Sequence, residues 1–554
     1  MSFNKNDEVC LTIENFGNEG EGIGRIDGYT LFVKGAVPGD KIKARLLKAN
    51  KNYGFAKIEE LLEASPDREN PPCPVYDKCG GCSLMHVKYA RELKYKEDKV
   101  RDCIERIGGF ERGSFIFNQI VGMENASPSN RPLRYRNKAQ FPVGLNNDGK
   151  IITGFYASRS HRITPITDCP IEASVTGDIL RAVKKYMAEN NILAYDEVNH
   201  KGLIRHIMTR LGFATGEVGI CLVINGDKLP FADKLIPLLK EAVDGKYNLT
   251  SVCVNINKEK TNVIMGKKLS VIYGRSYITD KIGDIAFHIS PMSFYQVNHT
   301  QTEKLYAKAL EYAALTGNET VWDLYCGIGT ISLFLAKKAA KVYGVEIVPE
   351  AIENAKENAK LNNIVNAEFT AGAAEAVAIH LPKPDVIVVD PPRKGCDGKL
   401  IETILKYKPN RLVYVSCDPA TLARDLKLLA ADGAYKLIEV TPVDQFSGSF
   451  HVETVCLLSK GDVKSQKLRV EFSLEDMDTD GFKKGATYNA IRDWVKEKYG
   501  YRVTNLNIAQ VKQKHGIIER ENYNKPKSAE SKQPGCPEEK IKAIEDAMRH
   551  FQMI

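Results

Sequence analysis

The first 66 residues alternate apolar and polar positions with a period of two. Turns rich in glycine separate four such runs, which end at Ile13, Val33, Leu47 and Ile58. Short alternating runs of this kind predict a small antiparallel barrel of the oligonucleotide-binding type over residues 1–66. Nine basic and ten acidic residues precede the breaker-rich linker at 65–72. A docking role for the barrel therefore stays open beside nucleic-acid binding.

The pattern becomes helical over residues 83–110, with a mixed-charge face that we expect to be exposed. From about 130 to 285, strand-like runs surround a helix near 172–190. We assign residues 67–285 to a central α+β region.

Beyond position 300 the chain alternates helical segments with short apolar runs at 321–325, 341–346, 386–390 and 412–415. Strands separated by helices of this length predict a parallel, doubly wound, Rossmann-like sheet, which we place at 286–462. Residues 466–554 form a small, mainly helical extension, with amphipathic patterns from Tyr488 and from Ile508 and a last helix ending at Phe551. The fold class is α/β.

Composition narrows the class of protein. The 554 residues carry a net charge of +8, which is a weak argument for a nucleic-acid partner. Because no stretch of about 18 apolar residues and no apolar leader is present, we expect a cytoplasmic protein without a membrane partner. Thirteen cysteines in such a chain favour metal binding or catalysis over disulfides. The sequence leaves the oligomeric state open, and a monomer is the simplest expectation.

A cofactor loop is predicted where the first strand of the sheet ends. Asp323-Leu-Tyr-Cys-Gly-Ile-Gly329 opens a helix, and Glu346 ends the next strand, where a carboxylate can bind ribose hydroxyls. The three-glycine dinucleotide fingerprint is absent, which favours S-adenosylmethionine over a nicotinamide cofactor. Asp390-Pro-Pro-Arg393 supports this choice, and Arg393 stands where enzymes that methylate amines carry an aromatic residue.

Cys417 follows an apolar run at the end of another predicted strand. Open α/β sheets bind their ligands at this edge, so the thiol is a candidate nucleophile. A small buried core cysteine is the alternative.

Three further cysteines, Cys73, Cys79 and Cys82, lie within ten residues of Pro- and Gly-rich chain. Cys169, in a similar turn-like context, is the best fourth partner. Four thiolates bind either an iron–sulfur cluster or a structural zinc, and spacing alone does not decide between them. We expect packing roles for the cysteines in predicted strands, helices and the cofactor loop: Cys10, Cys103, Cys221, Cys253, Cys326, Cys396 and Cys456.

A basic, aromatic segment lies between Asn130 and Arg162, with seven Lys and Arg residues against one acid. Cations for phosphates and aromatic rings for unstacked bases predict single-stranded RNA binding. The candidates are Arg134, Arg136, Lys138 and Phe141. A solvated charged face over core aromatics is the alternative.

Together these motifs resemble the RNA uracil-5-methyltransferase family, most closely its bacterial 23S ribosomal RNA branch. The resemblance rests on Asp390-Pro-Pro-Arg-x-Gly395, followed after sixteen residues by Leu-Val-Tyr-Val-Ser-Cys417, and it extends over about the first 460 residues. It implies a TRAM domain at 1–66 and a helix at 83–110 that packs on the methyltransferase domain. It also implies a [4Fe–4S] cluster on Cys73, Cys79, Cys82 and Cys169, and S-adenosylmethionine bound by Gln296, Tyr325, Glu346 and Asp390.

The resemblance further implies the chemistry. Cys417 adds to uracil C6 to make C5 nucleophilic, and Glu453 removes the C5 proton as general base. The expected product is 5-methyluridine in ribosomal RNA. The alternatives are a transfer-RNA methyltransferase and, in another class, a non-catalytic RNA-binding or assembly factor.

Two departures from the family pattern bear on this site. Asp418 replaces the usual asparagine, and we expect its charge to raise the pKa of Cys417. The segment before Glu453 lacks a proline after Phe446 and has Gly448 at a normally polar or aromatic position. We therefore expect a looser loop there.

Overall fold

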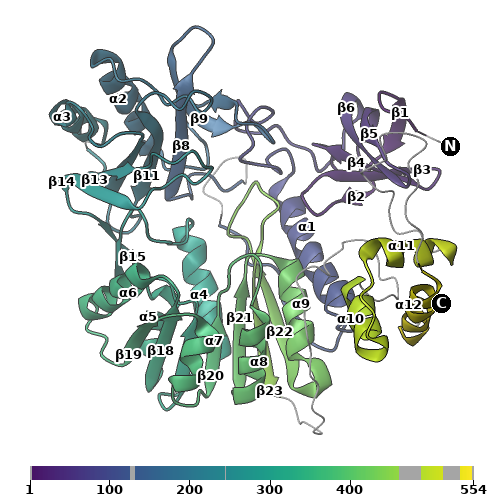
Figure 1. Ribbon diagram of the computed structural model, residues 1–554. Helices are drawn as coiled ribbons and strands as arrows, with labels where there is room; N and C mark the ends of the chain where they lie inside the picture. The colour runs from purple at the N-terminus through teal and green to yellow at the C-terminus, as the bar shows by residue number, and fades with distance from the viewer. Residues whose placement is uncertain (1–2, 125–130, 244, 461–487, 516–536, 552–554) are drawn as a thin grey trace. The chain divides into compact units, whose positions relative to one another are not determined.

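The computed structural model describes residues 3–124, 131–243, 245–460, 488–515 and 537–551. The chain divides into two compact units, residues 1–465 and 466–554 (Figure 1). Each unit has its own hydrophobic core, so each is described separately. In the described residues, no helix is both long and apolar enough to cross a membrane.

The N-terminal barrel is confirmed. Its six strands follow the order β1-β5-β6-β4-β3-β2, and only β4 and β6 pair in parallel. Alternation places Leu31, Val33, Ile42, Ala44 and Leu46 in the core. The strands are β1 (Glu8–Thr12), β2 (Asn15–Phe16), β3 (Gly22–Ile26), β4 (Tyr29–Lys34), β5 (Lys41–Ala49) and β6 (Tyr53–Glu63).

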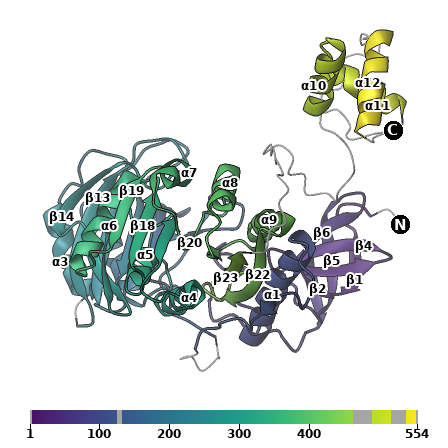
Figure 2. The ribbon, with the colours of Figure 1, turned by 90° about the horizontal axis from the view of Figure 1, so that it is seen from below.

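Helix α1 (Tyr89–Asp102) lies between the barrel and the C-terminal part of the first unit (Figure 2). A single π-helical turn, Cys103–Ile107, continues it. The Tyr95 hydroxyl donates to the carbonyl of Gly17 in the barrel, at 2.9 Å. On the other side α1 contacts α9 (Pro419–Leu429) and β22 (Tyr435–Val443), and Val100 joins the hydrophobic core of the eight-stranded sheet to which β22 belongs. The helix thus bridges two domains.

The central region is a seven-stranded sheet of order β10-β9-β8-β11-β12-β13-β14. Helices α2 (Val175–Glu189) and α3 (Ala232–Val243) pack on one face of this sheet. The strands are β8 (Lys138–Leu145), β9 (Ile151–Tyr156), β10 (Ile163–Pro165), β11 (Ile204–Leu211), β12 (Glu217–Ile224), β13 (Asn248–Ile256) and β14 (Lys268–Gly274).

The predicted doubly wound sheet has eight strands in the order β19-β18-β17-β20-β21-β23-β22-β7. Strands β17 to β21 are mutually parallel, whereas β23 is antiparallel to both of its neighbours. The strands are β17 (Thr320–Leu324), β18 (Lys341–Glu346), β19 (Ala367–Ala371), β20 (Val386–Val389), β21 (Arg411–Ser416), β22 (Tyr435–Val443), β23 (Glu453–Lys460) and β7 (Ile116–Phe117).

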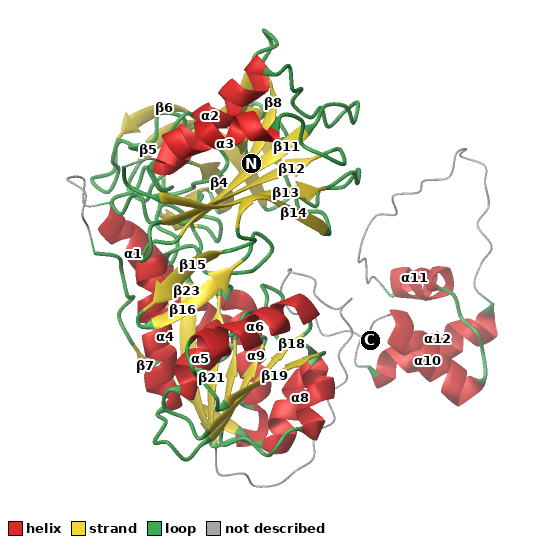
Figure 3. Cartoon of the chain, turned by 90° about the vertical axis from the view of Figure 1, so that its left-hand side faces the viewer, coloured by secondary structure: helices red, strands yellow, loops and turns green. Residues whose placement is uncertain are grey.

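Helices cover both faces of this sheet (Figure 3). One face packs on α4 (His299–Ala313), α5 (Thr330–Ala336) and α6 (Pro349–Leu361). The other packs on α1, α7 (Ala374–Val377), α8 (Gly398–Tyr407) and α9 (Pro419–Leu429).

A hairpin precedes α4, formed by β15 (Ile278–Ile282) and β16 (Ile285–Ile289). The domain boundary expected at 285/286 falls inside it. Ile278 and Ile282 belong to the hydrophobic core of the eight-stranded sheet. Judged by this packing, the domain that contains the sheet begins before Ile278.

The second unit contains α10 (Tyr488–Tyr499), α11 (Asn505–Lys514) and α12 (Glu538–His550). Apolar residues spaced three to four apart, among them Ile491, Val495, Ile544 and Met548, form its core. The helical character expected of the extension is confirmed.

Four charged side chains are buried together where α1 meets the C-terminal part of the first unit. Lys96 Nζ lies 2.8 Å from Glu92 and 2.6 Å from Asp444, and Arg131 lies 2.8 Å from Glu92. Burial lowers the pKa of Lys96, but Asp444 and Glu92 outweigh burial and raise it above its usual value. Each of the two cations has two carboxylate partners, because Arg131 Nε also lies 2.8 Å from the partly exposed Glu69, and such pairing is the condition for burying these charges at tolerable cost.

Glu92→Gln removes one charge from this group. We expect a destabilisation of about 3–5 kcal/mol, because a cation is left buried without its full counter-charge. Thermal unfolding followed by near-UV circular dichroism measures the effect as a lower midpoint. The matched control is Glu63→Gln in the exposed Lys41–Glu63 pair, which should leave the midpoint unchanged. Equal midpoints for the two variants would contradict this account.

Candidate active site

The cofactor loop connects β17 to α5 at the point where the sheet reverses its strand order. β17 pairs with β18 on one side and with β20 on the other, which is the switch point where open α/β sheets bind ligands. Tyr325, Gly327 and Gly329 have φ values of 73°, 56° and 84°. Glycine adopts this left-handed conformation without steric strain. Because Gly327 and Gly329 have no side chains, a ligand can approach the backbone there.

The Glu346 carboxylate closes one side of this loop. It accepts hydrogen bonds from Gly327 N at 3.3 Å and Val348 N at 3.0 Å. Glu346 therefore lies at the end of β18 beside the glycine turn, as the sequence predicted for a ribose-binding acid. Gln296 lies in the segment between β16 and α4 and is 94% buried. Its backbone carbonyl accepts a hydrogen bond from Asn137 Nδ2.

Asp390 directly follows β20, beside the cofactor loop. Burial, and then the nearby Asp323, raise the pKa of Asp390 to about 7. Burial likewise raises the pKa of Asp323 to about 7, although Ser332 Oγ donates to that carboxylate at 2.5 Å. Two acids with raised pKa values at the switch point form an environment that favours a cationic ligand.

Strand register places Cys417 next to Glu453. β21 and β23 run antiparallel, and Ser416 pairs with Thr454. One residue beyond this pair, Cys417, which directly follows β21, and Glu453, the first residue of β23, occupy neighbouring positions at the same edge of the sheet. Residues 36 positions apart in the chain are thereby brought together.

The electrostatics agree with this placement. Burial, and then Glu453 and Asp390, raise the pKa of the Cys417 thiol to about 12. Burial and Asp390 raise the pKa of Glu453 to about 8, whereas Arg393 lowers it. Arg393 acts on the thiol in the same direction. Cys417, Glu453 and Asp390 are thus three neighbouring acids, each of which disfavours the ionisation of the others. The Arg393 cation favours their ionisation.

His451 is a neutral member of this neighbourhood. Burial, and then Arg393, lower the pKa of its imidazole to about 4. The ring packs on Phe450, with centroids 4.2 Å apart. Near neutral pH it can donate one hydrogen bond and accept one.

Asp418 has a local structural role in addition to the expected electrostatic one. Its Oδ1 accepts from Ala420 N and Thr421 N at 3.0 and 2.9 Å, which caps the N-terminus of α9. The charge of Asp418 does raise the pKa of Cys417, but this effect is smaller than the effects of burial, Glu453 and Asp390.

The segment before Glu453 is tightly held, so the expectation of a looser loop is wrong. Gly448 has a φ of 82°, and a Cβ there would lie 3.1 Å from Met85 Cγ. Its amide donates to Glu92 and its carbonyl accepts from Ser83 N and Leu84 N. The glycine suits a left-handed turn pressed against the cysteine-bearing loop. No local sequence pattern indicates this contact, because the partners of Gly448 lie about 360 residues away along the chain.

The four candidate metal ligands line one cavity of about 420 Å³. Cys73, Cys79, Cys82 and Cys169 share it with Arg136 and Lys138. Burial, and then Glu172, raise the pKa of Cys169 to about 12; burial, and then the other three thiols, raise that of Cys82 above its usual range. Within the described ranges, no three His, Cys, Asp or Glu side chains converge closely enough to bind a single metal ion.

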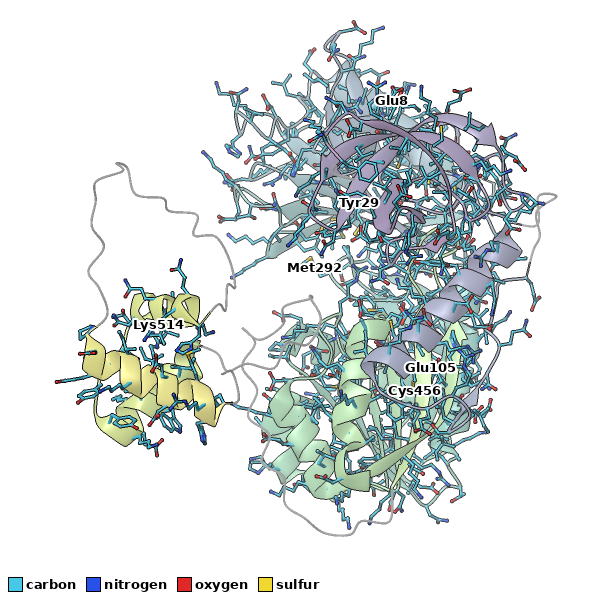
Figure 4. All side chains as sticks on the ribbon, turned by 90° about the vertical axis from the view of Figure 1, so that its right-hand side faces the viewer. Glu8, Tyr29, Glu105, Met292, Cys456 and Lys514 are labelled. Atoms are coloured by element: carbon cyan, nitrogen blue, oxygen red, sulfur yellow. The ribbon has the colours of Figure 1, made fainter. Side chains whose placement is uncertain are left out.

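The remaining cysteines mostly pack as expected. Cys221, Cys253, Cys326, Cys396 and Cys456 are buried; Cys456, on β23, is labelled in Figure 4. Cys103 is half-buried beside Lys99. Cys10 is exposed, which corrects its predicted packing role: it lies on the outer face of β1, a barrel-edge strand.

The RNA-contact candidates have different surroundings. Arg134 is half-exposed and pairs with Asp168 at 2.6 Å, and Arg136 pairs with Glu172 at 3.2 Å. Burial, and then Arg210 and Arg136, lower the pKa of Lys138 to about 7. Phe141 is fully buried with its ring 4.7 Å from that of Phe155, so it is a core residue and cannot stack on a base.

Comparison with known proteins identifies the family. Residues 255–461 match the family described as tRNA (Uracil-5-)-methyltransferase, and residues 3–58 match the TRAM domain. A relative from Halalkalibacterium halodurans, described as an uncharacterized RNA methyltransferase, is 49% identical over 82% of this chain and 97% of its own length. One from Clostridium tetani, described in the same words, is 47% identical over 82% and 97%.

A solved structure agrees. The Pyrococcus abyssi tRNA (uracil-54, C5)-methyltransferase in complex with S-adenosyl-L-homocysteine has a TM-score of 0.64 and 27% identity, over 81% of this chain and all of that one. The switch-point cradle and this likeness define an S-adenosylmethionine-dependent methyltransferase. The chain belongs to the RNA uracil-5-methyltransferase family and carries a TRAM domain.

Glu453→Gln removes the side chain that contributes most, after burial, to the high pKa of Cys417. Since the thiolate is the reactive form, we expect alkylation of Cys417 by iodoacetamide at pH 8 to become about three- to tenfold faster. Mass spectrometry of the Cys417 peptide over time gives the rate. Glu63→Gln serves as the remote control and should not alter it. An unchanged rate in Glu453→Gln would show that the two groups do not interact.

Proposed function

We propose that the enzyme methylates uracil C5 in 23S ribosomal RNA through a covalent adduct between Cys417 and uracil C6. The observation that carries the proposal is the antiparallel register that brings Cys417 and Glu453 to one sheet edge, beside Asp390. A thiol, a carboxyl group and a cofactor cradle are the parts that C5 methylation requires.

Gln296, Tyr325, Glu346 and Asp390 would hold S-adenosylmethionine, which would supply an electrophilic methyl group on a positively charged sulfur. Burial, and then Asp323, raise the pKa of Asp390, so a positive charge held nearby would favour its ionised form. We expect the same charge to lower the pKa values of Cys417 and Glu453, as the Arg393 guanidinium does. Filling the cradle thus prepares both reacting groups.

The steps follow from the chemistry of uracil. The Cys417 thiolate adds to C6, and the electron pair of the C5–C6 double bond becomes available at C5. C5 would then take the methyl group from the sulfonium, and the electron pair of the broken S–CH3 bond would stay on sulfur, which leaves as a neutral thioether. Glu453 then accepts the C5 proton. The electrons of the broken C–H bond restore the C5–C6 double bond, and the C6–S bond breaks to return the thiolate. A base inside a paired or stacked RNA must first be flipped out to reach the thiol.

We propose Arg134, Arg136 and Lys138 as contacts for the RNA backbone, since they belong to the basic segment between Asn130 and Arg162 and cations suit phosphates. The barrel together with the four-cysteine cavity favours the ribosomal branch of the family. A transfer-RNA substrate is the second candidate, because the Pyrococcus abyssi structure is that of a tRNA methyltransferase.

Deletion of the gene tests substrate and mechanism together. We expect 5-methyluridine to disappear from 23S ribosomal RNA and to return on complementation with the wild-type gene. Complementation with Cys417→Ala should leave it absent. Nucleoside mass spectrometry of separated ribosomal and transfer RNA measures both. Loss from transfer RNA alone would favour the second candidate, and full activity of Cys417→Ala would exclude the covalent route and leave a non-catalytic thiol.

We also propose a [4Fe–4S] cluster on Cys73, Cys79, Cys82 and Cys169. Support comes from the cavity that the four thiols share. A tetrahedral zinc, with Zn–S bonds of about 2.3 Å, would draw four sulfurs into a tight group. A cluster of eight atoms holds its thiolates farther apart and suits a cavity of about 420 Å³ better.

Anaerobically purified protein should be brown and contain about four iron and four sulfide ions per chain. Cys82→Ser should lose the colour and most of the iron, whereas Cys10→Ser, at an exposed position in the barrel, should retain both. Metal analysis and visible absorption spectra provide the test. One zinc per chain without iron would decide for the structural metal.

A further inference from the structure

The loop that precedes Glu453 is held by atoms from several distant parts of the chain. Residues 444–452 connect β22 to β23, and six of the first seven, 444–450, are hydrogen-bonded to groups outside this segment. Lys96 Nζ donates to Asp444 Oδ1 at 2.6 Å and to the Phe446 carbonyl at 3.0 Å. Such a network of buried, satisfied polar groups fixes a loop in one conformation.

Helix α4 holds the start of the loop. Gln301 Nε2 donates to the Asp444 carbonyl at 3.0 Å, and Asn298 Nδ2 donates to the Gln445 carbonyl at 3.1 Å. Tyr89 of α1 donates to the other oxygen of Asp444 at 2.7 Å. Two helices on opposite sides of the sheet therefore anchor the same turn.

Two contacts connect the loop to segments that carry other proposed functions. The Tyr135 hydroxyl donates to the Ser447 carbonyl at 2.8 Å, and Tyr135 lies between Arg134 and Arg136. The Phe450 amide donates to Ser83 Oγ at 3.1 Å, and Ser83 follows Cys82. The Gly448 carbonyl accepts from Ser83 N and Leu84 N at 2.9 Å. The base-bearing loop thus contacts both the RNA-contact segment and the cysteine loop.

Only His451 and Val452 separate Phe450 from Glu453. A shift of the Phe450 backbone is therefore transmitted to the carboxyl group over about two residues. Displacement of a reacting group by about 1 Å is enough to slow a reaction strongly.

We propose that Tyr135 and Ser83 are positioning residues for Glu453: they tie the loop at 444–450 to the RNA-contact segment and the cysteine loop, so that removal of the C5 proton depends on both. This inference rests on the proposed covalent mechanism. The step affected is the last one, in which the C5–H proton moves to Glu453, the C5–C6 double bond forms and the C6–S bond breaks. Steps before it need Cys417 and the methyl donor, not the carboxylate.

The consequence is a specific chemical signature. When proton removal is slowed, the methylated adduct of RNA on Cys417 accumulates and survives SDS. We expect this for Tyr135→Phe and Ser83→Ala, and more strongly for the double variant. The value of kcat should fall about tenfold in the double variant, while KM for S-adenosylmethionine stays within about twofold of wild type. Ser83→Thr, which keeps the hydroxyl, should restore the wild-type behaviour.

The experiment uses the full-length enzyme, methyl-labelled S-adenosylmethionine and the RNA fraction that loses 5-methyluridine in the deletion strain. Labelled protein–RNA adduct is quantified on denaturing gels, beside kcat, KM, iron content and the thermal midpoint. The matched control is Tyr186→Phe, because Tyr186 is also buried and donates to a backbone carbonyl, that of Pro230, in the separate core of the central sheet. It should behave as wild type.

Glu453→Gln separates the possible failures. If Glu453→Gln accumulates adduct and the Tyr135 and Ser83 variants do not, the positioning role is overturned and the proposed mechanism stands. A fall in kcat with a lower thermal midpoint or lost iron, without adduct, also overturns it, because the residues are then merely structural. If wild-type enzyme methylates uridine but Glu453→Gln forms no adduct, the assigned base and the inference fail together.

Discussion

The active site depends on one reversal of strand direction. Every strand from β17 to β21 runs in parallel, and their carboxyl ends supply the cofactor loop, Asp390 and Cys417. β23 enters the sheet beside β21 in the opposite direction, so its first residue, not its last, lies at this edge. Glu453 can face the cofactor edge only because of this antiparallel insertion. The loop before β23 must then cross the active-site edge, which explains why its conformation is so fully determined.

Burial of like charges is the second constraint. Asp323, Asp390, Glu453 and Cys417 all have raised pKa values, since each is desolvated near another acid. These side chains alone therefore form an environment that is poorly suited to hold all four groups ionised. A cationic ligand relieves that repulsion, and the affinity for such a ligand and the reactivity of the thiol become linked through the same field.

Local patterns were sufficient to predict the barrel, the doubly wound sheet and the helical extension, because each depends on residue spacing within one segment. The cofactor turn could also be predicted, because its glycines and Glu346 lie only about twenty residues apart in the chain. The sequence failed where a role depends on distant partners. Lys96 appears as one charge on a mixed-charge helix, yet its ammonium group is fully buried between Glu92 and Asp444. Phe141 lies near several arginines in the sequence, but the alternation of side chains along β8 directs its ring into the core. Gly448 suggested looseness, whereas its missing side chain allows close packing.

The contacts of Lys99 affect how the activity of shortened forms of such enzymes should be interpreted. Lys99 Nζ donates both to the Asn18 carbonyl of the barrel, at 2.8 Å, and to the Phe450 carbonyl, at 3.2 Å. A single ammonium group is thus shared by the TRAM domain and by the turn that leads to Glu453. A chain without its barrel loses one of these two acceptors and exposes the first unit's α1 to water. Weaker methylation by such a truncated chain would not, by itself, demonstrate that the barrel recognises RNA.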